Sequence, residues 1–247
     1  MRYPETVNAL LINTYVDDIQ TGGNDPEHLF RFKREATEIM EEGGFRLHKW
    51  HSNVPEVEES ATVDLANQAA SGAPVKILGI PWNKTRDEFS VSFEDNALGD
   101  EVQQLTKRKM LAIVNSIYDI LGLASPVTVV GKILYSKVCL SSKRWDEAIT
   151  DPEILKGWKK WLKGLNECTN VRVPRSVVDH NVRRLELHGF SDASKKAVSA
   201  AVYVVAHHDE KPIKQTLLVS KSRIAPKNQS IPRLELVAAH NLTNLMG

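Results

Sequence analysis

The chain of 247 residues is long enough for one large domain or two modest ones, each able to bury its own apolar core. Its composition is ordinary for a globular protein, and no apolar run approaches the roughly 20 residues that span a bilayer, so we expect no membrane partner. The chain opens without a signal-peptide pattern, and Cys139 and Cys168 show no CxxC or Cys/His pairing. These features indicate a reducing, intracellular setting, cytoplasmic or nuclear, with neither disulfides nor a zinc site.

The net charge of +1 conceals a strong asymmetry between the two halves of the chain. Residues 1–101 carry nine Lys or Arg against 19 Asp or Glu, whereas residues 102–247 carry 23 against 12. A basic half of this size commonly faces phosphate backbones, but it could equally dock on the acidic half of its own chain. Composition alone leaves both interpretations open.

The first hundred residues show the patterns of both strands and a helix. Asp25 and Pro26 form an N-terminal capping pattern, and Gly43 with Gly44 ends the apolar periodicity that follows them. In chain order we expect a buried strand over 9–16, a helix over 25–43, a strand over 45–50, a surface loop over 55–73, and a hairpin of 75–82 with 88–93.

From Thr106 onward the apolar spacing becomes helical. Pro126, Pro152 and Pro232 each stand where a first helical turn would begin. We therefore expect helices over 106–122, 126–140, 152–165 and from 232 to the chain end, a polar linker over 166–181, and strands over 184–192, 197–206 and 213–221.

The run Tyr15-Val16-Asp17-Asp18 places two adjacent carboxylates directly after the first predicted strand. Neighbouring carboxylates repel one another unless a cation or solvent screens them. Two-metal phosphoryl transfer needs such a cluster to hold two Mg²⁺ ions about 3.5–4 Å apart. Taken as a bare tetrapeptide, the run fits a solvated Asp-Asp turn better than a metal site, because four-residue matches recur by chance.

The surrounding runs are typical of one class of mobile element. Phe45 to Asn53 reads FRLHKWHSN, Ile77 to Trp82 reads ILGIPW, and Tyr118 to Pro126 reads YDILGLASP. Together with Tyr-Val-Asp-Asp, these runs resemble the pol polyprotein of BEL/Pao retrotransposons over nearly the whole chain. The resemblance implies an α+β fold, a parent RNA-directed DNA polymerase with RNase H, and Mg²⁺ or Mn²⁺ as the cofactor.

The same resemblance divides the chain into parts. Residues 1–101 would be the C-terminal part of a reverse-transcriptase palm, 102–165 a helical thumb or connection, 166–181 a linker, and 182–247 the N-terminal part of an RNase H-like domain with a mixed sheet and one helix. The implied partners are an RNA–DNA or DNA primer–template duplex and the remainder of the pol polyprotein.

In the palm the resemblance assigns a role to several single residues. It makes Asp17 and Asp18 metal ligands on a hairpin, places Tyr15 near the primer end, and matches Lys49 to a lysine that protonates the leaving pyrophosphate. Gly79 would lie in the primer-grip turn, where backbone approaches nucleic acid. For Lys49 an exposed strand lysine, and for Gly79 an ordinary hairpin glycine, are the plain alternatives.

One departure limits the expected activity. Reverse transcriptases carry a third palm carboxylate on a strand well upstream of this hairpin, and a fingers domain that grips the nucleotide. Only 16 residues precede Asp17. We therefore expect that this chain alone does not polymerise DNA.

Basic residues punctuate the three predicted middle helices, with tryptophans among them. If these helices track the phosphates of a duplex, their contacts are sequence-independent and salt-sensitive. The alternative is a solvated helical face with tryptophans in a small core. The nucleic-acid-binding candidates here are Lys107, Arg108, Lys109, Lys132 and Lys137; further basic residues are Lys143, Arg144, Lys156, Lys159, Lys160 and Lys163.

A second carboxylate pair lies in the last third of the chain. Asp192 ends a predicted strand, and Glu235 stands in the first turn of the last predicted helix. The resemblance makes both of them RNase H metal ligands, while a helix-dipole interaction is the plain alternative for Glu235. The family's further aspartates are expected downstream, so we expect weak Mg²⁺ binding and no efficient RNA cleavage. We also expect this pair and the Asp17–Asp18 pair to form two separate sites.

Two classes of function therefore stay open, with a third behind them. The chain is either part of a polymerase and RNase H enzyme or a catalytically silent nucleic-acid-binding module derived from a retroelement; a protein-interaction scaffold is the third. Metal-dependent cleavage of an RNA–DNA hybrid separates the first two, and binding that salt does not weaken favours the third. His48-x-x-His51 reads as surface histidines, and no Asp-Thr-Gly or Asp-Ser-Gly supports an aspartyl peptidase.

Overall fold

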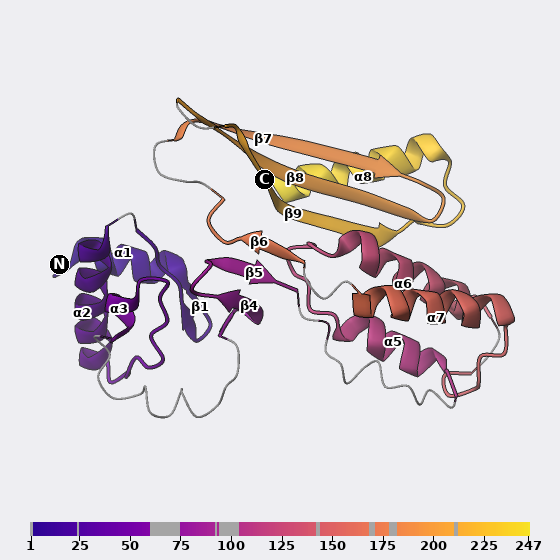
Figure 1. Cartoon of the computed structure of the whole chain (residues 1–247), viewed down its shortest axis with the longest axis horizontal. Coiled ribbons are helices and arrows are strands. Elements are labelled where there is room, and N and C mark those ends of the chain that lie inside the picture. Colours follow the sequence, from indigo (N-terminus) through magenta and orange to yellow (C-terminus); the bar gives the residue numbers. More distant parts are fainter. Residues whose placement is uncertain are drawn as a thin grey trace. The chain divides into compact units, whose positions relative to one another are not determined.

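The computed structural model shows two compact units, which we describe separately (Figure 1). The first comprises Met1–Leu78 with Asn83–Asp87, and the second Gly79–Trp82 with Glu88–Gly247. The structure describes residues 2–23, 25–59, 75–91, 93, 104–141, 144–167, 171–177, 182–209 and 212–247. Within these ranges, no helix is both long and apolar enough to traverse a lipid bilayer.

The first unit is built around α2, which runs from Pro26 to Glu42. Asp25 caps α2 by accepting a hydrogen bond from the Glu27 N–H at 3.0 Å, and Gly43 follows the last turn, which confirms the predicted helix. Phe32 and Ala36 are buried on α2. The other elements of this unit are α1 (Pro4–Asn13), β1 (Thr14–Tyr15), β2 (Asp18–Ile19), α3 (Pro55–Glu59) and β3 (Lys76–Ile77).

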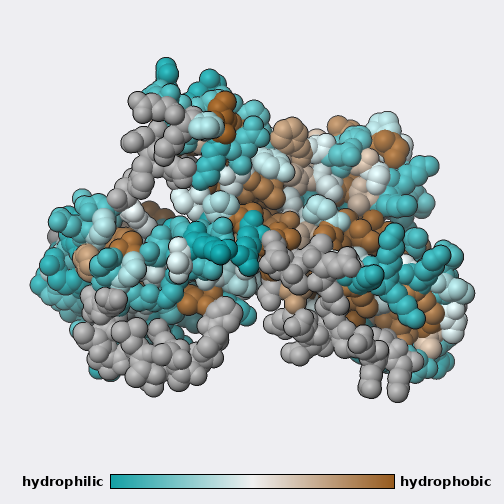
Figure 2. Space-filling model, viewed as in Figure 1, coloured by the Kyte–Doolittle hydropathy of each residue, from teal (hydrophilic) through white to brown (hydrophobic). Residues whose placement is uncertain are grey.

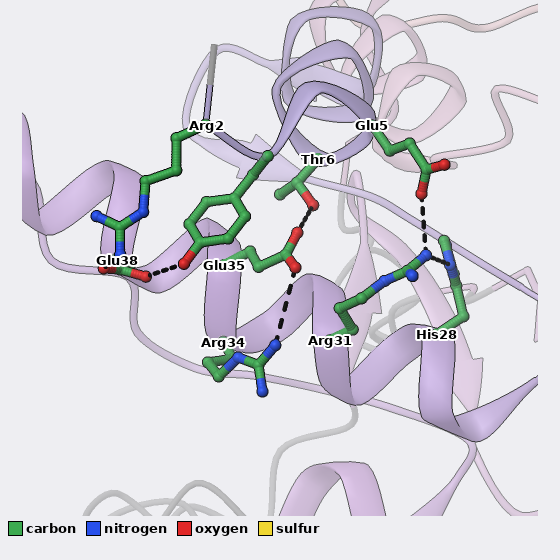
Figure 3. A network of polar contacts seen from close by, with 9 residues as sticks. Arg2, Glu5, Thr6, His28, Arg31, Arg34, Glu35 and Glu38 are labelled. Atoms are coloured by element: carbon green, nitrogen blue, oxygen red, sulfur yellow. Dashed lines mark hydrogen bonds and ion pairs between the residues drawn. The ribbon is translucent and has the colours of Figure 1, made fainter.

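A polar network joins α1 to α2 (Figure 3). The Thr6 hydroxyl donates to the carboxylate of Glu35 at 2.5 Å, and both residues are buried. Nearer the chain start, the Tyr3 hydroxyl donates to Glu38 at 2.8 Å. Because a buried carboxylate without a donor is costly, the Thr6 hydroxyl stabilises this helix pair.

Two strand predictions in this unit are wrong. Residues 9–13 belong to α1 and not to a buried strand, and only Thr14 and Tyr15 are extended. Pro4 at the first helical position favours the helix, and α1 packs on α2. Residues 45–50 form no strand, and Lys49 has a positive φ of 57°, which interrupts an extended run. In the predicted 55–73 loop, 55–59 are helical and 60–73 lie outside the described residues.

The second unit contains a small sheet and three helices. In the sheet, β5 (Glu88–Ser90) pairs antiparallel with β6 (Arg172–Pro174), and β4 (Ile80–Asn83) precedes them in the strand order. Strand β6 lies within the segment predicted as a linker. The helices are α5 (Lys107–Ser116), α6 (Ser125–Cys139) and α7 (Pro152–Glu167), close to the predicted positions.

The three helices share one apolar core. Met110, Val138, Trp158 and Leu165 are almost fully buried in it. A β-carbon on Gly131 of α6 would come within 2.4 Å of the Trp161 ring, so the glycine is what lets α6 and α7 approach closely. Trp158 and Trp161 of α7 are core residues, as one of the two interpretations of the sequence expected.

The last part of this unit is an antiparallel sheet covered by a helix (Figure 1). Its strands are β7 (Val182–Ala193), β8 (Ala197–His208) and β9 (Lys214–Ile224), in that order, and α8 (Ile231–Met246) lies along one face. These elements confirm the three predicted strands and the final helix. Strand β8 is central and buries Val198, Val202 and Ala206.

The loop between α5 and α6 joins the helices to β9. The Asp119 carboxylate accepts from the N–H groups of Leu123 and Ala124, both at 2.8 Å. The Ser220 N–H donates to the carbonyl of Leu121 at 2.8 Å, and the Ser220 hydroxyl to the carbonyl of Gly122 at 2.6 Å. The YDILGLASP run therefore ties the loop between α5 and α6 to β9 by hydrogen bonds. The predicted helix over 106–122 ends early, at Ser116.

Candidate functional site

Asp192 lies next to the last residue of β7, the edge strand of the sheet. It faces Ser199 of β8 in the strand register, and it is exposed. Successive side chains on a strand alternate between faces, so Asp192 points to the face opposite that of Ala193. Within the described ranges its carboxylate makes no hydrogen bond or ion pair, which leaves its oxygens open to solvent or a cation.

Glu235 lies near the beginning of α8, one residue after the buried Leu234. It is exposed, and its carboxylate has no protein partner in the part of the chain that the structure describes. Ser230, at the N-cap position, makes no side-chain hydrogen bond to the helix. Glu235 is the fifth residue of α8 and lies beyond its first turn, so its predicted place in the first turn is wrong and the helix dipole stabilises it little.

The packing of α8 places the two carboxylates at one end of the sheet. Leu234 shares an apolar cluster with Val198 and the partly buried Ala193. Toward the other end of the helix, Leu242 lies where a β-carbon on Gly189 would come within 2.8 Å. Helix α8 therefore runs antiparallel to β7, and Asp192 and Glu235 each adjoin a residue of the same cluster.

This end of the sheet fits a divalent cation only in part. Carboxylate oxygens are the ligands that Mg²⁺ and Mn²⁺ prefer, and no basic side chain among the described residues forms an ion pair with these two. No group of three or more His, Cys, Asp or Glu side chains able to hold a metal ion occurs among the described residues. Asp192 and Glu235 thus supply two carboxylates, which is less than the set that two metals require.

A charged cluster on β7 was missed by the sequence analysis. The Glu186 carboxylate lies 2.8 Å from His188 Nε2, 3.0 Å from an Arg184 guanidinium nitrogen and 3.3 Å from His207 Nε2. The His188 contact is the main cause that lowers the pKa of Glu186 below its usual value, and the Arg184 and His207 charges act in the same direction. The i, i+2 spacing of Glu186 and His188 was the one available signal.

The Tyr-Val-Asp-Asp run forms a tight hairpin in the first unit. Tyr15 of β1 pairs with Asp18 of β2, and Val16 and Asp17 form the turn. Val16 has a positive φ of 56°, which two-residue hairpins require and which β-branched residues rarely adopt. The carboxylates of Asp17 and Asp18 are exposed and make no hydrogen bond or ion pair in the described ranges. Within those ranges the structure thus gives the two residues a hairpin but no metal cluster.

The other two palm candidates occupy unusual backbone positions. Lys49 is exposed at a positive φ, outside any strand. Gly79 has a φ of +81°, and a β-carbon there would come within 2.8 Å of the Tyr118 ring. The need for glycine at this position is thus explained by local geometry, and its contact with nucleic acid stays a prediction.

The basic triplet at the start of α5 makes contacts within the protein. Lys107 is buried and donates to the Ser141 carbonyl at 2.9 Å. Arg108 holds Asp146 through two hydrogen bonds of 2.7 and 3.0 Å, and Lys109 donates to a backbone carbonyl at 3.0 Å. On α6, Lys132 is half-buried and Lys137 is exposed in the last turn.

Comparison with known families identifies the second unit. Residues 106–247 match the family model described as the Pao retrotransposon-like RNaseH-like domain. The chain belongs to this family. A search of the curated proteins finds no match to it.

Membership of the Pao family confirms the resemblance inferred from the sequence motifs and the α+β character of the fold. The matched region includes α5, α6 and α7 as well as the sheet and α8, so it begins well before residue 182. Residues 1–105 lie outside the match, and the reverse-transcriptase palm there stays a prediction.

Proposed function

We propose that this chain is part of a retroelement pol protein whose RNase H-like region binds an RNA–DNA duplex and presents Asp192 and Glu235 to Mg²⁺ or Mn²⁺. The observation that carries the proposal is the packing of Leu234 with Ala193 and Val198, which puts Glu235 at the same end of the sheet as Asp192, while the Asp192 side chain itself points to the face that α8 does not cover. Both side chains come from elements of the matched family region.

The chemistry of the proposed site is phosphate handling by oxygen-bound cations. A divalent cation, when bound, neutralises charge on the phosphate and lowers the pKa of a water molecule. The contribution of the chain is to hold carboxylates on a strand and a helix, where neither makes an ion pair with a described residue that would compete with the cation. Asp192 and Glu235 supply two of the ligands for such a site.

Cation binding provides the first test. We expect Mn²⁺ binding by the full chain, followed by electron paramagnetic resonance, to weaken in Asp192→Asn and in Glu235→Gln. Asp209→Asn is a matched control, because Asp209 follows β8 at the opposite end of the same sheet and pairs with Arg183. Equal Mn²⁺ affinity in Asp192→Asn, Glu235→Gln and wild type would remove both residues from the proposal.

Cleavage of a labelled RNA–DNA hybrid provides the second test. With two carboxylates we expect slow hydrolysis or none, and any hydrolysis should require Mg²⁺ or Mn²⁺ and disappear in Asp192→Asn. Hydrolysis that persists in this variant would place the chemistry elsewhere.

For residues 1–101, which include the whole first unit, we propose the C-terminal part of a reverse-transcriptase palm. The supporting observation is the hairpin that exposes Asp17 and Asp18 beside Tyr15. Lys49 and Gly79 keep their proposed roles beside phosphate and primer. We expect Asp17→Asn with Asp18→Asn to lower the number of Mn²⁺ ions bound, independently of Asp192; an unchanged number would contradict this assignment.

The second candidate is a nucleic-acid-binding module without catalysis. It is favoured by the lack of a three-ligand cluster in the described part of the chain. For this candidate, hybrid binding should be salt-dependent and equal in wild type and Asp192→Asn, with no cleavage at any Mn²⁺ concentration. Binding that does not weaken with salt would instead favour a protein-interaction role.

A further inference from the structure

Helix α7 presents a row of four lysines to solvent. Its buried side carries Trp158, Trp161 and Leu165. The opposite side carries Lys156, Lys159, Lys160 and Lys163, all exposed. Their i, i+3, i+4, i+7 spacing places the four side chains on one helix face. Figure 2 shows hydrophilic residues beside hydrophobic ones on the visible surface of the helical part of this unit.

The charges of this lysine row are not neutralised by described residues. None of the four ammonium groups makes an ion pair or hydrogen bond there, whereas the α5 triplet is engaged by Ser141, Asp146 and a backbone carbonyl. Like charges three and four residues apart repel and weaken a helix. Helix α7 tolerates this repulsion because its tryptophan side is packed in the core. A polyanion that neutralised the four lysines would relieve the repulsion.

The helix is also held rigidly. Trp161 Nε1 donates to the Val127 carbonyl of α6 at 2.9 Å, and the two tryptophan ring centroids lie 4.6 Å apart. The close approach of Gly131 to Trp161 fixes α6 against α7. Lysines on a fixed helix lose less conformational freedom on binding than lysines on a loop.

We propose that the lysine row of α7 is the phosphate-contacting surface of this chain for a double-stranded nucleic acid. Seven residues of helix span about 10 Å, and a duplex offers about six phosphates over that length. Single strands are usually bound with exposed aromatic rings, and membranes with apolar side chains; the row includes neither, and both tryptophans of α7 are buried. The inference deepens the proposed function, because it specifies the surface that meets the duplex.

The test is duplex binding by the full chain in EDTA, followed by fluorescence anisotropy over a range of salt concentrations. A plot of log K against log salt has a negative slope. We expect the quadruple variant K156Q/K159Q/K160Q/K163Q to reduce the magnitude of this slope by roughly three to four, at about 0.9 for each lysine that contacts phosphate. Glutamine keeps the helix propensity, and the quadruple Lys→Arg variant should retain the wild-type slope.

The matched control removes the same charge from scattered, exposed positions, in the variant R46Q/K76Q/R86Q/K227Q. An equal loss of slope in this control would overturn the proposal, because net charge alone would then explain binding. Tighter binding of wild type to a single strand, to phosphatidylserine vesicles or to polyglutamate would also overturn it, as would no duplex binding. Because EDTA removes divalent cations, failure here is separable from failure of the carboxylate site.

Discussion

Among the glycines that the structure describes, Gly122 is the one where an added methyl group would approach backbone most closely, so Gly122→Ala should strongly destabilise the second unit. It has a φ of +72°, and a β-carbon there would lie 1.8 Å from the Ser220 carbonyl oxygen. That contact is with backbone, which cannot rotate away as a side chain can. In Gly122→Ala either the loop or β9 must move.

The size of the effect follows from two terms. The left-handed backbone costs a non-glycine residue about 1–2 kcal/mol. Displacing the loop breaks the two hydrogen bonds that Ser220 donates to Leu121 and Gly122, each contributing about 0.5–1.5 kcal/mol. We therefore expect a destabilisation of roughly 2–5 kcal/mol, or a fall in Tm on the order of 5–15 °C for a unit of this size.

Thermal unfolding monitored by tryptophan fluorescence measures this effect, because Trp158 and Trp161 are buried in the second unit. Gly44 has a φ of +78° with open space around it, so Gly44→Ala isolates the backbone strain in the first unit. Gly164 lies inside α7 with open space, and Gly164→Ala should stabilise by about 0.5–1 kcal/mol. If Gly122→Ala lowers the stability of its unit no more than Gly44→Ala does, the contact of the loop with β9 is not rigid and the reasoning is refuted.

Three further predictions concern buried or charged side chains. Thr6→Val should destabilise the first unit by about 1–3 kcal/mol in chemical denaturation, because the buried Glu35 carboxylate loses its donor; Glu35→Gln in the same background should recover part of the loss. His188 is the main cause that lowers the pKa of Glu186 in the folded state, and the ionised carboxylate therefore stabilises the fold at pH values above the unfolded-state pKa. This stability is lost as the pH falls through the folded-state pKa. Wild type and Glu186→Gln should therefore differ in stability near neutrality and converge in acid unfolding curves. Burial, with Cys139 adding to it, raises the pKa of Tyr135 to about 12. Wild type should therefore lose stability relative to Tyr135→Phe between about pH 10 and 12. An absorbance titration of the phenolates that finds no late-ionising tyrosine would contradict the burial.

Local rules predicted most helices and the three-strand sheet. Capping residues such as Asp25 and Thr106 satisfy the first N–H groups of a helix from within a few residues, so their effect can be seen in the sequence alone. The alternation of apolar residues along β8 is equally local. The error at residues 9–13 arose because an apolar run can form a strand or a helix, and its neighbours decide which.

The candidate site was predictable only as separate residues. The sequence pointed to Asp192 and Glu235, but their placement at one end of the sheet depends on the antiparallel packing of α8 along β7. The basic triplet of α5 makes contacts that the sequence did not reveal, for a similar reason. Its partners Ser141 and Asp146 are 34 and 38 residues away, and no local pattern indicates them.

The sequence by itself determined the family and the order of helices and strands in the last 140 or so residues, and it singled out the candidate carboxylates, because motifs and periodicity are properties of neighbouring residues. The tertiary structure decided which charges stay free. Burial of one helix face against a partner leaves the opposite face to solvent, and on α7 that face carries the lysines. Long-range packing alone sets that choice, since it determines which side chains find a partner within the protein.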